Sequence, residues 1–174
     1  AEFMPLPEDP AKEVRELIEG LRNNAGTERI STLRKKLQEE MDANAQVFRT
    51  EETLTNVMGT INDLRERYKN VHVDDKGKRY NTDLLEAVEL GFLLDIAEIV
   101  AYAARNRKES RGGHMREDYP DRNDDKYMQH TMAYLTGDPH SANPEDHIRL
   151  DWKPVVFTKN EQGEYNYPPM ERKY

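Results

Sequence analysis

The sequence predicts an all-α fold: an antiparallel bundle of three long helices plus a shorter N-terminal helix, followed by an extended C-terminal arm with short strands. Apolar residues recur at helical spacing in four stretches before Arg107, and the helical pattern stops after it. Two later stretches are rich in β-branched and aromatic residues, which favours extended structure. We therefore expect an extended lead-in at residues 1–8, a helical bundle domain at 9–107, and a charged arm and tail at 108–174 that pack on the bundle or on a partner.

Two helices are expected in the first third of the chain. Asp9 can cap the first helix with Pro10 at its first position, where proline is tolerated. Thr27 can cap the second, whose apolar stripe continues from Ile30 to about Phe48. The buried face of the first helix is expected to carry the residues spaced i, i+3, i+4 and i+7, namely Val14, Leu17, Ile18 and Leu21.

The next two helices have clearer start signals. Thr50 caps the third helix together with Thr53, three residues on. The fourth begins near Asn81 or Thr82 and runs to about Asn106. Because it is apolar on nearly all sides, we expect the fourth helix to be the central one, with the first helix packed beside the bundle or facing another domain.

The arm is expected to hold two short extended segments, His130–Leu135 and Ile148–Phe157. Pro154 marks the second as an edge strand, because proline cannot donate to a sheet ladder. Residues 158–174 show no core pattern, which predicts that a neighbour orders the tail. The arm and tail carry aromatic residues of the kind favoured at interfaces: Trp152, Tyr165 and Tyr167.

Composition excludes several classes of function. The net charge of −8 argues against nucleic acid as a partner, because phosphate binding needs a basic surface. Cysteine is absent, which excludes disulfides, thiol catalysis and cysteine-ligated metal. No apolar run approaches the roughly 20 residues that span a bilayer, so we expect no direct membrane insertion and a soluble fragment. The chain begins Ala1-Glu2-Phe3-Met4, from which we expect a piece of a longer protein.

The most distinctive segment, residues 105–125, changes charge sign halfway along. Its first part is basic and its second part acidic, and Gly112 and Gly113 allow a tight turn. Arginine forks bind carboxylates bidentately, so we interpret the segment either as a structural clasp that holds the arm on the bundle or as a docking surface. The candidate residues for these roles are Arg111, His114, Arg116, Asp118, Tyr119 and Arg122.

Other polar residues predict neither a catalytic nor a metal site. The five histidines lack the spacing of metal ligands, and we interpret them as structural or surface residues. The acidic residues at 118–125 lack the register of a calcium loop, and Ser110 has no evident base partner. Carboxylates on the fourth helix spread around it, which favours pairing with arginines such as Arg65 or Arg67, or a surface position, over acid–base chemistry. These carboxylates are Glu86, Glu89, Asp95 and Glu98.

The segment Ser110–Asp124 also resembles the C-terminal region of the flavoprotein subunit of succinate dehydrogenase and fumarate reductase. That family carries Ser-Arg-Gly-Ala-His followed by Arg-x-Asp-(Tyr/Phe)-Pro-x-Arg-Asp-Asp; here Gly113 replaces the alanine and Asn123 the first aspartate of the closing pair. The similarity runs from about Glu8 to Tyr174. It includes the stretches Asn44–Arg49, Leu64–Tyr68 and Tyr80–Glu86, and an actinobacterial-type tail, Met170–Tyr174.

The resemblance implies a parent enzyme that oxidises succinate to fumarate with FAD and passes electrons to an iron–sulfur subunit and quinone. The motifs of the flavin and capping domains lie upstream of this region in the family, so it implies no catalytic, cofactor-binding or metal residue in these 174 residues. The expected partners are the flavin and capping domains and the iron–sulfur subunit, in a membrane-associated complex on the cytoplasmic side of the plasma membrane.

Two alternatives stay open from the sequence. The chain could be a stand-alone helical interaction module without catalytic activity. It could also be a small autonomous enzyme that uses the carboxylates of the fourth helix, among them Glu86 and Asp95.

Overall fold

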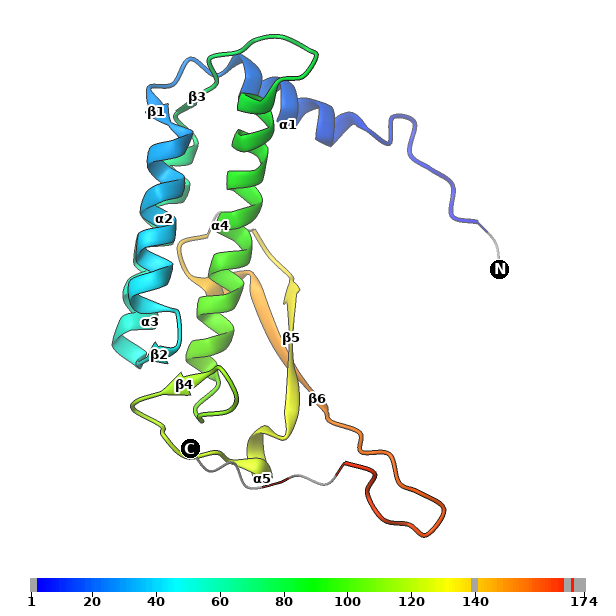
Figure 1. Cartoon of the computed structure of the whole chain (residues 1–174). Helices are drawn as coiled ribbons and strands as arrows, with labels where there is room; N and C mark the ends of the chain where they lie inside the picture. Colours follow the sequence, from blue (N-terminus) through cyan, green and yellow to red (C-terminus); the bar gives the residue numbers. More distant parts are fainter. Residues whose placement is uncertain (1–2, 139–140, 168–169, 171–174) are drawn as a thin grey trace.

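The computed structural model describes residues 3–138, 141–167 and 170, and it is mainly helical with short strands, as the sequence predicts (Figure 1). The helices are α1 (Lys12–Asn23), α2 (Ile30–Asn44), α3 (Glu51–Tyr68), α4 (Thr82–Asn106) and α5 (Asp124–Tyr127), with a 3-10 turn, η1, at Pro144–Asp146. The strands are β1 (Glu28–Arg29), β2 (Phe48–Arg49), β3 (Val71–His72), β4 (Met115–Arg116), β5 (Gln129–Leu135) and β6 (Ile148–Pro154).

The core lies between α2, α3 and α4, which pack against one another and stand side by side in Figure 1. Each contributes apolar side chains at helical spacing, so their buried stripes meet along one axis. The side chains with no exposed surface there include Leu33, Leu54, Val57, Ile61, Leu64 and Leu90. This shared stripe fixes where the ends of α3 and α4 lie.

Both predicted start signals of the later helices are confirmed. The Thr50 hydroxyl accepts from the Thr53 amide and the Thr53 hydroxyl accepts from the Thr50 amide, a complete capping box for α3. The Asn81 side chain accepts from the amide of Leu84 at 2.8 Å and caps α4. These caps satisfy amides that have no partner within the helix.

The predicted start of the first helix is wrong. Helix α1 begins at Lys12 with Ala11 at the capping position and no side-chain cap. The Asp9 carboxylate instead accepts from the guanidinium of Arg15 at 2.8 and 3.0 Å, because a charged donor outcompetes the backbone amides for it.

The predicted bounds of the second helix are also wrong at both ends. Residues Glu28–Arg29 pair in parallel with β3, so the helix begins at Ile30, and the Thr27 hydroxyl accepts from the Asn70 side chain instead of capping. At the other end α2 stops at Asn44, because Phe48 and Arg49 form β2, which pairs in parallel with β4. Phe48 is exposed, and the apolar stripe does not extend to it.

Two expected buried faces are only half buried. On α1, Leu21 is buried while Val14 and Leu17 are exposed. Helix α4 contacts α1, α2 and α3, yet its outward side stays open to solvent, with Phe92 57% and Ile96 58% exposed. The apolar residues on nearly all sides of α4 therefore do not make it an enclosed helix in this chain.

The two predicted extended segments form an antiparallel hairpin. β5 and β6 pair from Gln129 opposite Pro154 to Leu135 opposite Ile148, and Pro154 stands at the end of its strand. The hairpin lies beside the lower part of α4 in Figure 1 and contacts it through β5. None of the helices in the described part of the chain combines the length and apolar character that crossing a bilayer requires.

We predict that Leu64→Ala lowers the free energy of unfolding by about 2–5 kcal/mol, because it leaves a cavity where no side-chain surface is exposed. Leu85→Ala, at a half-exposed position on α4, is the matched control and should change it by less than about 0.5 kcal/mol. Denaturant unfolding followed by circular dichroism measures both. Equal losses in the two variants would contradict the assignment of the core.

Candidate functional site

The charged segment, residues 107–124, begins where α4 ends. Arg111 and His114 exchange backbone hydrogen bonds of 2.8 and 3.0 Å across a turn in which Gly112 has a φ of 61°, a left-handed conformation that glycine adopts without strain. Directly after the turn, β4 pairs with β2, the loop that joins α2 to α3. The local sequence thus places the arm across the ends of α3 and α4.

Arg116 is the best-anchored side chain of the segment, with no exposed surface. Its Nε and one Nη bind both carboxylate oxygens of Asp118 at 2.7 and 2.8 Å. The other Nη donates to the carbonyls of Ala104 and Arg105 at 3.0 and 2.8 Å, and Glu51 accepts the remaining bond at 3.2 Å. All five guanidinium donors are therefore used.

These bonds complement two helix ends. The carbonyls that Arg116 binds belong to the last turn of α4, where the helix dipole favours a cation. Asp118 in turn accepts from the amide of Glu51 at 2.9 Å, the first residue of α3, where the dipole favours an anion. The hydrogen bonds from Arg116 lower the pKa of Asp118 to about 2, because they stabilise its charged form.

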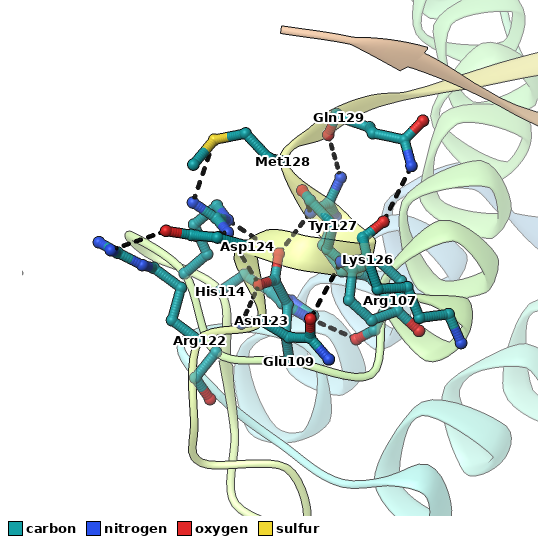
Figure 2. Close-up of polar contacts among 12 residues, drawn as sticks. Arg107, Glu109, His114, Arg122, Asn123, Asp124, Lys126, Tyr127, Met128 and Gln129 are labelled. Atoms are coloured by element: carbon teal, nitrogen blue, oxygen red, sulfur yellow. Dashed lines mark hydrogen bonds and ion pairs between the residues drawn. The ribbon is translucent and has the colours of Figure 1, made fainter. Parts of the chain in front are cut away.

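A second group centres on Glu109, which is fully buried (Figure 2). Its carboxylate accepts from Arg107 at 2.5 Å, from Arg111 at 2.9 and 3.1 Å, and from the amide of Asn123 at 2.9 Å. Burial alone would raise the pKa of Glu109, but these hydrogen bonds outweigh burial and hold the pKa below its ordinary value. Asp124 extends the group by accepting from Arg111 at 2.5 Å.

His114 lies against both groups and is held as a neutral ring. Arg49 can only donate, so its bond of 2.7 Å to Nδ1 makes that nitrogen the acceptor. Nε2 then carries the proton and donates to the carbonyl of Arg107 at 3.0 Å. Burial lowers the pKa of His114, and the positive charges of Arg49, Arg116 and Arg107 lower it further.

The six residues singled out from the sequence thus fall into two groups joined at His114. Arg116, Asp118 and Tyr119 form the first, where the Tyr119 ring lies 5.0 Å from the Arg116 guanidinium. Arg111 and Arg122 form the second and share Asp124, which accepts from Arg122 at 2.9 Å. Arg122 also donates to the carbonyl of Met170, while the rest of the expected tail motif, 171–174, lies outside the described residues.

Sequence reasoning missed Glu51, Arg49 and Glu109 as members of this site. Glu51 and Arg49 lie more than 60 residues earlier in the chain and meet the segment only through the β2–β4 pairing. Glu109 stands between Arg107 and Arg111, a spacing that could have indicated it as their shared acceptor. Burial of Glu109 depends on tertiary packing and has no local signal.

The carboxylates of α4 do not converge on a catalytic pair. Arg65 binds Asp95 and Glu98 at 2.8 Å each, as predicted for this arginine, whereas Arg67 pairs with Glu28. Glu98 is buried and also accepts from His147 Nε2 at 3.0 Å, a hydrogen bond that the sequence did not indicate and that ties the start of β6 to α4. Glu89 lies 3.4 Å from Arg34, and Glu86 is exposed.

The structure describes the surroundings of Ser110 and of the candidate metal ligands within residues 3–138 and 141–167. No group of three or more histidine or acidic side chains there could hold a metal ion, and His140 lies outside those ranges. The Ser110 hydroxyl accepts from the Arg116 amide at 2.8 Å and is engaged with the carbonyl of Tyr119 at 2.9 Å. Its contacts are those of a turn-stabilising residue.

Comparisons with known proteins agree with this arrangement. Residues 34–174 match the family described as fumarate reductase flavoprotein C-term. The chain is 39% identical over 170 residues to the succinate dehydrogenase flavoprotein subunit of Rickettsia bellii, covering 98% of this chain and 27% of that protein. It is 35% identical over 157 residues to the fumarate reductase flavoprotein subunit of Haemophilus influenzae, covering 90% of this chain and 25% of that protein.

Solved structures show the same fold. A mutant form of the FrdA chain of E. coli quinol fumarate reductase superposes with a TM-score of 0.77 at 31% identity, over 92% of this chain and 26% of that one. A chain of the apo Sdh1 complex of Mycobacterium smegmatis superposes with a TM-score of 0.76 at 25% identity, over 88% of this chain and 25% of that one. The chain thus spans about a quarter of the length of the relatives it matches.

We predict that Arg116→Ala lowers the free energy of unfolding by roughly 2–4 kcal/mol, because it leaves Asp118 and two helix carbonyls without their charged donor. Arg149→Ala removes an exposed pair with Asp151 and should cost less than about 1 kcal/mol. Denaturant melts at pH 7 compare the two variants. A loss in Arg116→Ala no larger than in the control would contradict the role given to Arg116.

The stability of the chain at acid pH should show that Asp118 has a lower pKa than an ordinary carboxylate. Its pKa in the folded chain is about 2, below the ordinary 3.8. The contribution of its charged form to the free energy of unfolding is therefore complete above about pH 5 and is lost as the pH falls through about 2. Asp118→Asn should therefore destabilise the chain at pH 7, and this difference should shrink below about pH 4 and vanish only as the pH falls through about 2. Thermal melts across this range test it, and a constant difference at all pH values would contradict it.

His114 acts in a different pH window. Because its folded pKa lies below the ordinary 6.5, the unfolded chain binds more protons there, and stability falls as the pH drops below about 6.5. His114→Gln cannot titrate, so its melting temperature should change less between pH 7 and 5.5 than that of the unaltered chain. Identical slopes would show that protonation of His114 does not act on folding.

Proposed function

This chain belongs to the family of fumarate reductase and succinate dehydrogenase flavoprotein C-terminal domains, and from that premise we propose that it acts as the non-catalytic scaffold of a succinate dehydrogenase flavoprotein subunit. The observation that carries the proposal is that the side chains of the charged segment bind other parts of the same chain. The five N–H donors of Arg116 and the carboxylate of Glu109 already form hydrogen bonds to helix ends and to the arm itself. These groups therefore have no donor or acceptor left to bind a substrate.

The sheets of the described residues differ from those of a dinucleotide-binding fold. A dinucleotide fold needs a parallel sheet whose first strand leads through a glycine-rich turn into a helix. The sheets described here are all two-stranded, and the parallel ones pair only two residues on each strand. We therefore propose that FAD and succinate bind elsewhere in the parent subunit, and that the parent passes electrons to an iron–sulfur subunit and quinone on the cytoplasmic side of the plasma membrane.

Within the scaffold we propose different roles for the bundle and the arm. The antiparallel bundle of three long helices, residues 9–107, would be the rigid part, and residues 108–174 the arm that is fastened to it. Arg111, His114, Arg116 and Asp118 serve as the clasp. This is supported by the burial of Arg116 and its bonds to the end of α4, and by the bond of Asp118 to the start of α3. His114 adds a bond to the carbonyl of Arg107, and Arg111 holds Asp124 of the arm. Tyr119 and Arg122, at the exposed rim, are the members of the set that we propose for contact with the iron–sulfur subunit.

A chimera tests the proposed function. The C-terminal region of the Rickettsia bellii subunit is replaced by this chain, to which it is 39% identical. We predict that the chimera keeps bound flavin and succinate-dependent dye reduction, that Arg116→Ala lowers its melting temperature by several degrees, and that the 174-residue chain alone binds no FAD and reduces no dye.

Two results would contradict the proposal. Dye reduction by the 174-residue chain alone would make it an enzyme in its own right. A folded chimera that retains flavin but whose stability is indifferent to Arg116→Ala would mean that the clasp does not support the parent subunit.

A further inference from the structure

Helix α4 carries a second apolar face that this chain leaves uncovered. Its residues recur at i, i+7, i+11 and i+14, the spacing of one side of a helix. They lie roughly opposite the buried side of α4, which includes Leu90, Leu94 and Ala101. The uncovered face consists of Leu85, Phe92, Ile96 and Ile99, flanked by Leu93 and Val100, with exposed fractions between 37% and 58%.

Helix α1 extends this face. Leu17 of α1 and Phe92 of α4 line a common hollow of about 190 Å³, together with Tyr68 and Val88. Val14, one turn before Leu17, is also exposed. Contiguous apolar surface of this kind, rimmed by polar residues, marks interaction sites in soluble proteins.

The charges near the face are already paired. Asp95 binds Arg65 at 2.8 Å, and Glu89 lies 3.4 Å from Arg34. Because ion pairs neutralise these groups, the surface suits an apolar protein neighbour and does not suit nucleic acid or a charged peptide. Helix α1 lies near the N-terminal end of α4, whereas the charged segment joins its C-terminal end (Figure 1).

We propose that this face, Val14 and Leu17 of α1 with Phe92, Ile96 and Ile99 of α4, seats the part of the flavoprotein that precedes this region in the relatives. The inference rests on the proposed function. The relatives are about four times as long as their match, and the matched family is their C-terminal part, so most of each relative lies before it. The lead-in to α1 also offers apolar side chains to a neighbour, because Phe3, Met4 and Leu6 are exposed.

Side-chain footprinting tests the proposal on the full 174-residue chain and on the chimera. Hydroxyl radicals should label Phe92, Leu93 and Ile96 in the chain, and the chimera should protect them several-fold. Val156, which is exposed and lies just after β6, before the tail, is the internal reference. Equal labelling of Phe92 and Ile96 in chain and chimera would overturn the proposal.

A substitution gives an independent readout. Ile96→Asp should lower the melting temperature of the chimera by several degrees and leave that of the 174-residue chain unchanged, because only the chimera buries this position. Val156→Asp is the matched control and should affect neither protein. An equal loss in both proteins after Ile96→Asp would show that the face belongs to the chain's own core and would overturn the proposal.

Two further outcomes separate the possible failures. Sedimentation should show the chain as a monomer; a dimer that Ile96→Asp dissociates would assign the face to a second copy and overturn the proposal. A chimera that protects the face but lacks dye reduction would contradict the proposed function and leave the assignment of the surface standing.

Discussion

Arg116 connects the two helix ends on which the arm depends. One side of its guanidinium binds the last carbonyls of α4, and the other side reaches the start of α3 through Asp118 and Glu51. A buried cation at a helix C-terminus and a carboxylate at a helix N-terminus both complement the helix dipoles. Since β4 carries Arg116 and pairs with β2, the same contact fixes where the arm crosses the bundle.

The polar composition of the chain follows from this construction. Beyond α4 the arm buries few apolar side chains, among them Tyr127 and Ile148. Charge-assisted hydrogen bonds hold it instead, at Arg116, at Glu109 and between Glu98 and His147. Such bonds are directional, so they fix one register of the arm in a way that a smooth apolar contact does not.

Sequence reasoning predicted the features that local chemistry determines: the capping box at Thr50, the cap at Asn81 and the two extended segments that form β5 and β6. It misplaced the start of α1, where Arg15 takes the carboxylate of Asp9. It also misplaced both ends of α2, because strand pairings only two residues long, set by tertiary contact, override local propensity there. It expected α4 to be the central helix, and α4 does contact α1, α2 and α3, but one of its apolar sides stays exposed. Apolarity alone does not distinguish a core face from a face that a neighbour covers, and the burial of Glu109 has no local signal although its position between two arginines does.

A double-mutant cycle at Arg116 and Asp118 tests the central claim most directly. Unfolding free energies at pH 7 are measured for Arg116→Ala, Asp118→Ala and the double variant. If the pair joins the helix ends as described, the two losses should be strongly non-additive, with a coupling of about 1–3 kcal/mol. Additive losses would mean that the two side chains stabilise the fold separately, and that something else fastens the arm to the bundle.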